Sequence, residues 1–134
     1  MAQQLLRRFN GYGCSMIGAC RVVAYCTDVV IILNSPLGCA HILRDRELVR
    51  NYQSSNPLRG LFNSISRKIV YTNLTDADSI YGSAAKLRNC IRQVINSYNA
   101  AYIIVVNSCM VGVIGDDVDG IVAEIEGDYR LPII

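Results

Sequence analysis

Three short apolar runs divide the chain and predict the buried strands of a sheet. They cover residues 29–33, 68–72 and 102–106, and polar or turn-forming residues bound each of them. Short runs rich in β-branched residues suit strands that are covered on both faces, as in a parallel sheet. A fourth apolar run at residues 131–134 ends the chain and predicts a last strand.

Helical spacing of apolar residues appears between these runs. Residues 83–98 carry the clearest pattern, because apolar residues recur on one face and polar residues occupy the opposite face. Residues 117–126 show the same spacing, and Asp116 and Asp117 at its start are expected to cap it and favour its dipole, with a role as functional acids as the alternative. The other expectations are short helices at 17–26 and from 39 to about 43, a connection at 73–81, and irregular or loop segments at 1–13 and 44–66.

The alternation of strands and helices predicts an α/β fold, a Rossmann-like doubly wound parallel sheet. The length fits a single domain, residues 1–134, in which a segment at 1–27 precedes a core at 28–134. Ligands of such sheets bind in the crevice outside the carboxyl ends of the strands. The terminal apolar strand predicts an edge that a partner or a further part of the protein covers.

Charge and apolar content narrow the function classes. The formal net charge is +2, and the basic residues are scattered rather than gathered into an aromatic-interleaved stripe, so we expect no nucleic-acid partner. No apolar run approaches the roughly 18 residues that span a membrane. The N-terminus also lacks the apolar core of a signal peptide. These features predict a cytoplasmic protein with no membrane contact.

Six cysteines are many for a chain of this size. In the reducing cytoplasm they indicate metal binding, redox chemistry or core packing rather than disulfides. Cys39 and Cys109 each follow a predicted strand, so two thiols could converge on one object, with Cys109 on a loop between strand and helix. Core packing is expected for Cys20, Cys26 and Cys90, although Cys20 and Cys26 could be spare ligands. His41 is expected to be a plain helix-start or surface residue, with a proton relay as the alternative.

Three cysteine contexts follow one another in a recognisable order. They are Gly13-Cys14, the run Pro36-Leu37-Gly38-Cys39-Ala40, and Ser108-Cys109 followed by Ile114-Gly115-Asp116-Asp117-Val118. Between the last two lies the run from Thr72 to Gly82, which leads into Lys86-Leu87. Over most of its length the chain thereby resembles the first domain of the nitrogenase component 1 family. Asn34-Ser35 stand where that family usually has His-Gly, and Gly82-Ser83 replace its glycine pair.

The resemblance implies that Cys14, Cys39 and Cys109 ligate an iron–sulfur cluster at the interface of two similar subunits. Three thiolates per chain leave two cluster types open, a larger P-cluster-like cluster with six thiolates or a 4Fe-4S cluster completed by another residue. The partner would be a second copy in a homodimer or a similar subunit in a heteromer. The resemblance further implies electron transfer from an ATP-dependent iron–sulfur reductase protein.

Three functions follow as hypotheses. The first is a redox subunit of a nitrogenase-like oxidoreductase, not a complete enzyme alone, because the family's later domains are absent from the chain. The second is a scaffold that carries a cluster or cofactor precursor without turnover. The third is a truncated, metal-free interaction domain.

Overall fold

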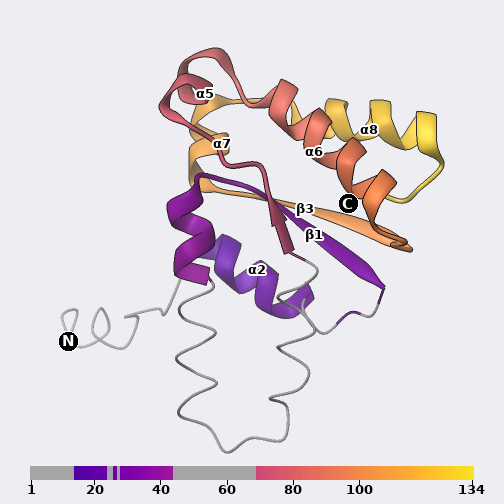
Figure 1. Cartoon of the computed structure of the whole chain (residues 1–134). Coiled ribbons are helices and arrows are strands. Elements are labelled where there is room, and N and C mark those ends of the chain that lie inside the picture. Colours follow the sequence, from indigo (N-terminus) through magenta and orange to yellow (C-terminus); the bar gives the residue numbers. More distant parts are fainter. Residues whose placement is uncertain (1–13, 24–25, 27, 44–68) are drawn as a thin grey trace, which may run out of the picture.

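The computed structural model describes residues 14–23, 26, 28–43 and 69–134. These residues contain a three-stranded sheet of β1 (Val29–Asn34), β2 (Ile69–Tyr71) and β3 (Tyr102–Asn107). Both strand pairs are parallel, and the order is β2-β1-β3 (Figure 1). The three predicted strands are therefore confirmed to within one residue at each end. The central strand β1 is buried along its whole length because its side chains are covered from both sides of the sheet.

The helices agree with the amphipathic pattern where that pattern is long. They are α2 (Ser15–Val23), a helical stretch at 37–43, α5 (Asp76–Tyr81), α6 (Ala84–Ser97), α7 (Cys109–Ile114) and α8 (Val118–Tyr129). The predicted helices at 83–98 and 117–126 correspond to α6 and α8. The expected short helices correspond to α2 and to the stretch at 37–43. The expectations for 1–13 and 44–66 lie outside the described residues.

Two local expectations were wrong. Residues 76–81 form α5 instead of a plain connection, because the carboxylate of Asp78 accepts hydrogen bonds from the N–H and the hydroxyl of Thr75 at 2.6 and 2.7 Å. Cys109 is the first residue of α7 instead of a loop residue. Ser108 stands at its N-cap, and α7 ends at Gly115, which adopts a left-handed conformation with φ 77°.

Apolar side chains of β1 alternate between two cores. Val30 and Ile32 join Ile103 and the buried faces of α6 and α8 on one side of the sheet. Val29, Ile31 and Leu33 pack with residues of α2 on the other side. Figure 1 shows α6 and α8 over one face and α2 over the opposite face. The sheet is thus doubly wound, as the alternation of elements predicts.

The end of the chain pairs with β3. A parallel bridge joins Ile133 to Ile103, and Val105 donates a backbone hydrogen bond of 2.7 Å to the carbonyl of Ile134. The predicted last strand is therefore present as an extended segment beside β3. Among the described residues, no helix has the length and apolarity to cross a membrane.

Candidate metal centre

The strand order creates a topological switch point between β1 and β3. The chain leaves β1 toward β2 on one side, and it returns to the sheet at β3 on the other side. Ligands of open α/β sheets bind outside the carboxyl ends of the strands at such a point. Cys39 lies in the helical stretch that follows β1, and Cys109 begins the helix that follows β3. The two predicted thiols therefore flank the switch point.

Cys14 is the third cysteine near this point. Burial raises the pKa of the half-buried Cys39 thiol, and the nearby charges of Cys109 and then Cys14 raise it further. Thiolates act on one another in this way only when they are close in space. Cys14 and Cys109 are themselves exposed. The three predicted thiols are thus within electrostatic range of one another, and two of them are exposed.

The spacing of the donors does not match a site for one ion. Among the residues that the structure describes, no three His, Cys, Asp or Glu side chains converge closely enough to bind a single metal ion. In an iron–sulfur cluster the thiolates bind different irons, so they stand farther apart than the ligands of one ion do. A set of three cysteines is also the donor chemistry of such clusters. The three cysteines thus supply the donor atoms that such a cluster uses.

The remaining cysteines divide into two groups. Cys20 and Cys90 are buried in the two apolar cores, as predicted. Burial, followed by the charge of Cys14, raises the pKa of Cys20 to about 11, and burial raises the pKa of Cys90. Core packing was the wrong expectation for Cys26, which is exposed just beyond α2. His41 is an exposed residue of the stretch at 37–43, in agreement with a surface histidine.

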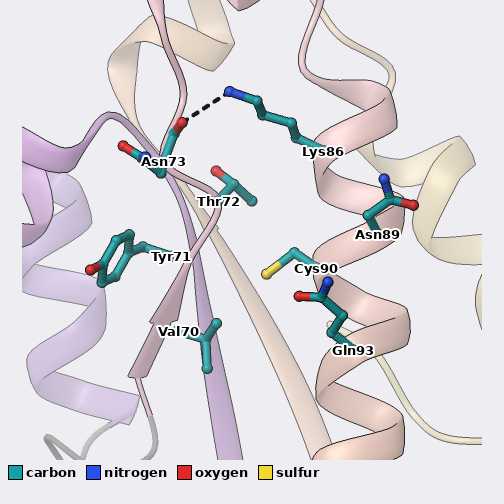
Figure 2. Close-up of a pocket in the computed structure, with 8 residues that line it drawn as sticks. All are labelled: Val70, Tyr71, Thr72, Asn73, Lys86, Asn89, Cys90 and Gln93. Carbon is teal, nitrogen blue, oxygen red and sulfur yellow. Dashed lines mark hydrogen bonds between the residues drawn. The ribbon is translucent and has the colours of Figure 1, made fainter.

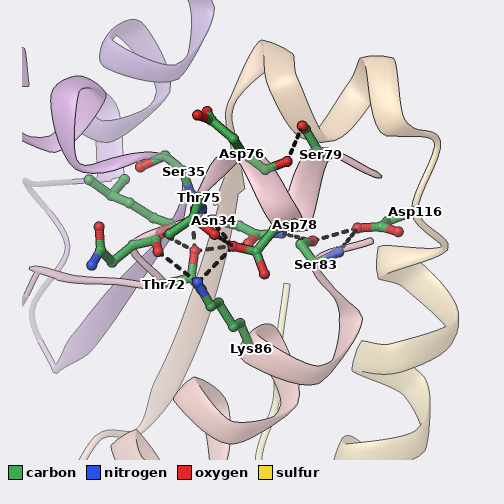
Figure 3. Close-up of polar contacts among 12 residues, drawn as sticks. Asn34, Ser35, Thr72, Thr75, Asp76, Asp78, Ser79, Ser83, Lys86 and Asp116 are labelled. Carbon is green, nitrogen blue, oxygen red and sulfur yellow. Dashed lines mark hydrogen bonds and ion pairs between the residues drawn. The ribbon is translucent and has the colours of Figure 1, made fainter. Parts of the chain in front are cut away.

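A buried polar network supports the carboxyl edge of the sheet. Asn34, at the end of β1, is fully buried and donates hydrogen bonds to Asn107 at 3.2 Å and to the hydroxyl of Ser83 at 3.4 Å. Its side-chain oxygen accepts a hydrogen bond of 3.0 Å from Thr72 (Figure 3). Because these residues follow or end all three strands, the network holds the strand ends in register and joins them to the start of α6 at Ser83.

Asp116 extends this network and differs from its expected role. Its carboxylate accepts hydrogen bonds from the N–H and the hydroxyl of Ser83 (Figure 3), so it does not cap α8. Asp117 does cap α8, as predicted, by accepting a hydrogen bond of 2.9 Å from the N–H of Gly120. The network was missed in the sequence, although one signal was available. Each predicted strand ends with or is followed by a polar residue, namely Asn34, Thr72 and Asn107.

A pocket of about 270 Å³ lies between β2 and α6 (Figure 2). Thr72, Lys86, Asn89 and Cys90 are among its lining residues, and none of the three candidate cluster ligands is. The ammonium of Lys86 is already engaged, with the carbonyl of Asn73 at 3.1 Å and the carboxylate of Asp78 at 2.6 Å. The pocket is therefore separate from the candidate metal centre.

Comparison with known proteins agrees with this geometry. A family model described as nitrogenase component 1 type oxidoreductase matches residues 14–134. The nitrogenase iron-molybdenum cofactor biosynthesis protein NifE of Methanosarcina barkeri is 32% identical over 108 residues, which cover 81% of this chain and 21% of that protein. The nitrogenase molybdenum-iron protein alpha chain of the same organism is 27% identical over 91% of this chain and 22% of its own length.

Solved structures agree in fold. A structure described as nitrogenase Cp1 at pH 6.5 superposes with a TM-score of 0.72 and 15% sequence identity, over 90% of this chain and 25% of that chain. The chain thus spans about a fifth to a quarter of the length of the relatives it matches. The family match, the cysteine contexts and the parallel sheet point the same way, and the chain belongs to the nitrogenase component 1 family.

Proposed function

We propose that this chain is the cluster-binding part of a nitrogenase-like oxidoreductase. Cys14, Cys39 and Cys109 hold an iron–sulfur cluster at the interface with a second, similar subunit. The observation that carries the proposal is the proximity of these three thiols, which come from different segments, at the switch point of the sheet. A cytoplasmic location, where the thiols stay reduced, fits this role.

The exposure of the thiols supports a shared cluster. Cys14 and Cys109 are open to the outside, so this chain alone covers only one side of a group bound there. A two-fold related or similar subunit would cover the other side and supply further donors. With six thiolates the centre is a larger, P-cluster-like cluster, and with a smaller set it is a 4Fe-4S cluster. When bound, the cluster supplies one-electron transfer.

Exposed apolar side chains on two neighbouring helices support a protein partner. Ile80 and Tyr81 on α5 are 76% and 87% exposed, and Val113 on α7 is 87% exposed. The two helices contact each other, and α7 begins at Cys109. Large apolar side chains gathered on one surface are typical of interaction sites. In the proposed role, the partners are the similar subunit and the ATP-dependent iron–sulfur reductase that delivers electrons.

Each of these residues has a defined task in this role. The thiolates of Cys14, Cys39 and Cys109 bind the cluster, and Cys39 is the partly buried one of the three. The network around Asn34 holds the strand ends that carry two of the thiols. A lower local polarity and hydrogen bonds to sulfur then set the potential at which electrons are exchanged.

A second function is favoured by one comparison. The relative that is 32% identical is a cofactor biosynthesis protein, whereas the alpha chain from the same organism is 27% identical. As a scaffold, the chain would carry a cluster or precursor and pass it to an acceptor without turnover. Transfer of iron from the loaded chain to a metal-free acceptor, with no reduction of substrate by the full complex, would favour this function.

Iron and acid-labile sulfide per chain test the proposal. The full chain is purified anaerobically and reconstituted, and its EPR spectrum and oligomeric mass are recorded. About two irons per chain in a dimer indicate one shared four-iron cluster. About four irons per chain fit either a larger shared cluster or one cluster per chain, and the EPR spectrum separates these two cases. Absence of iron after reconstitution would instead support the metal-free interaction domain.

Alanine variants assign the ligands. Cys39→Ala and Cys109→Ala are expected to lose most of the bound iron, because each removes one of the three proposed thiolate ligands. Cys26→Ala is the matched control, since Cys26 is also exposed but does not belong to the thiol group. Iron content equal to that of the wild type in either ligand variant would disprove the assignment.

A further inference from the structure

Two serine hydroxyls beside the candidate metal centre are buried without a hydrogen-bond partner among the described residues. They are the Oγ atoms of Ser35 and Ser108. The residues are 0% and 4% exposed. Buried hydroxyls of native proteins are nearly always paired, so an unpaired one calls for an explanation. Here two of them occur at the same edge of the sheet.

Both serines lie at the switch point. Asn34 and Asn107 are paired residues at the ends of β1 and β3, and Ser35 and Ser108 are the next positions on the two strands. The backbone N–H of Ser108 donates a hydrogen bond of 3.1 Å to the carbonyl of Asn34, which keeps the two positions adjacent. Ser108 directly precedes Cys109, so one of the orphaned hydroxyls is next to a proposed ligand in the chain.

Local structure does not use these hydroxyls. Ser108 stands at the N-cap of α7, but its side chain makes no capping hydrogen bond, and the N–H of Val111 binds the Ser108 carbonyl at 3.1 Å instead. Ser35 is joined to the polar network only through its backbone (Figure 3). Its N–H donates to the hydroxyl of Thr72 at 3.2 Å, and its carbonyl accepts from the N–H of Leu74 at 3.0 Å. Both backbones are thus held in place, while neither hydroxyl has a hydrogen-bond partner in the part of the chain that the structure describes.

We propose that Ser35 and Ser108 donate O–H hydrogen bonds to sulfur atoms of the cluster held by Cys14, Cys39 and Cys109. This inference rests on the proposed function. Sulfur of a thiolate or bridging sulfide accepts such bonds, and hydrogen bonds to sulfur are one of the factors that set cluster potentials. The positive end of each O–H dipole stabilises the more negative, reduced cluster. The hydrogen bonds from the two serines therefore raise the reduction potential of the cluster.

Ser35 differs from the residue that the family resemblance leads one to expect at this position. Asn34-Ser35 stand where the resemblance leads one to expect His-Gly. The side chain of Asn34 already makes its hydrogen bonds within the polar network, whereas Ser35 adds a hydroxyl that a glycine would lack. The Ser35 hydroxyl would thus be one of the donors that set the potential of this centre.

The test measures the reduction potential of the reconstituted full chain by EPR-monitored redox titration, together with iron per chain. The variants are Ser35→Ala, Ser108→Ala, and Ser35→Thr and Ser108→Thr, which keep the hydroxyl. Each alanine variant is expected to retain iron and to show a lower potential, with the threonine variants nearer to the wild type. Ser97→Ala is the control, because Ser97 is an exposed serine at the end of α6, just before the chain enters the amino end of β3. It should leave the potential unchanged.

The metal-free chain supplies a second readout. A serine-to-alanine change replaces the unpaired buried hydroxyl by hydrogen and so removes a desolvated polar atom. The alanine variants without iron should therefore be as stable to urea as the wild type or more stable. A clear loss of stability in the metal-free alanine variants would show that the hydroxyls have a structural partner, and would overturn the inference.

The outcomes separate this inference from the proposed function. Unchanged potential in both alanine variants with full iron content would overturn the inference and leave the cluster assignment standing. Loss of iron from the alanine and threonine variants alike would also overturn it, because the hydroxyl would not be the cause. Absence of iron from the wild type itself would refute the proposed function, and the inference with it.

Discussion

The carboxylate of Asp116 accepts two hydrogen bonds from Ser83, one from its backbone N–H at 2.6 Å and one from its hydroxyl at 2.5 Å. Ser83 is the N-cap of α6 and is 1% exposed. Asp116 lies 33 residues further along, in the connection between α7 and α8. This contact ties the helix that begins with Cys109 to the start of the longest described helix.

Replacement of Asp116 should therefore destabilise the fold. Asp116→Ala leaves the N–H and the hydroxyl of Ser83 buried without their acceptor, which is expected to lower the free energy of unfolding by about 1–3 kcal/mol. Asp117→Ala is the neighbouring control and removes one exposed helix cap, with an expected loss of about 1 kcal/mol. Urea unfolding followed by circular dichroism measures both. Equal or larger loss in Asp117→Ala would contradict the structural role of Asp116.

Gly82 and Gly112 form a second matched pair. Gly82 has φ 91°, and a Cβ atom there would stand 2.9 Å from the Asp116 carboxylate, so Gly82→Ala should destabilise the protein by about 1–3 kcal/mol. Gly112 lies within α7 with nothing within 4 Å of an added Cβ atom. Gly112→Ala should stabilise the protein by about 0.5–1 kcal/mol. Thermal unfolding of the two variants checks this opposite sign, and the same sign in both would refute it.

Asp78 makes stability depend on acid pH. The hydrogen bond from Lys86, followed by that from the Thr75 N–H, lowers the pKa of Asp78 from 3.8 to about 2. Because the folded-state pKa is the lower one, the contribution is fully present above about pH 4 and is lost as the pH falls toward 2. Asp78→Asn should cost about 1 kcal/mol at neutral pH, since the ion pair is partly exposed.

Urea midpoints between pH 2.5 and 7 measure this dependence. The difference between the wild type and Asp78→Asn should shrink toward pH 2.5, and it should also shrink in high salt, which screens the pair with Lys86. Asp128→Asn, a change at another acidic residue in the exposed part of α8, should show no such trend. A difference that stays constant over the whole range would exclude the proposed pairing.

Thiol reactivity should follow burial. In the folded, metal-free chain at neutral pH, iodoacetamide should label the exposed Cys14, Cys26 and Cys109 quickly. Cys20 and Cys90 should react slowly, because they are buried and burial raises the pKa of each thiol. Peptide mass spectrometry after a short pulse measures each site. With the cluster bound, Cys26 should remain the fast site, and labelling of Cys20 as fast as that of Cys26 would contradict the described packing.

Strands and long helices were predictable from local pattern. The apolar runs at β1 and β3 contain almost no polar residue, and only a strand covered on both faces can bury such a run. The helix α6 is equally clear, because its buried residues recur on one face. The sequence contexts of Cys14, Cys39 and Cys109, taken in order, also indicate the family, and the match to the family model confirms it.

Contacts between distant segments were not predictable in this way. The start of α5 is a local capping contact between Thr75 and Asp78, but the pairing of Asp78 with Lys86, which joins α5 to α6, has no such local signal. The role of Asp116 depends on Ser83, and nothing near Asp116 in the sequence indicates that partner. A polar side chain acquires its role from whatever packing places beside it.

The candidate metal centre depends both on local sequence pattern and on tertiary contacts. The sequence alone showed that Cys39 and Cys109 each follow a strand, because an apolar run of this length predicts a strand from local pattern. Only the parallel pairing of β1 with β3 made their strand ends neighbours, and only packing buried Ser35 and Ser108 beside them without partners among the described residues. Burial and hydrogen bonding are properties of the assembled chain, because they depend on which surfaces meet in three dimensions.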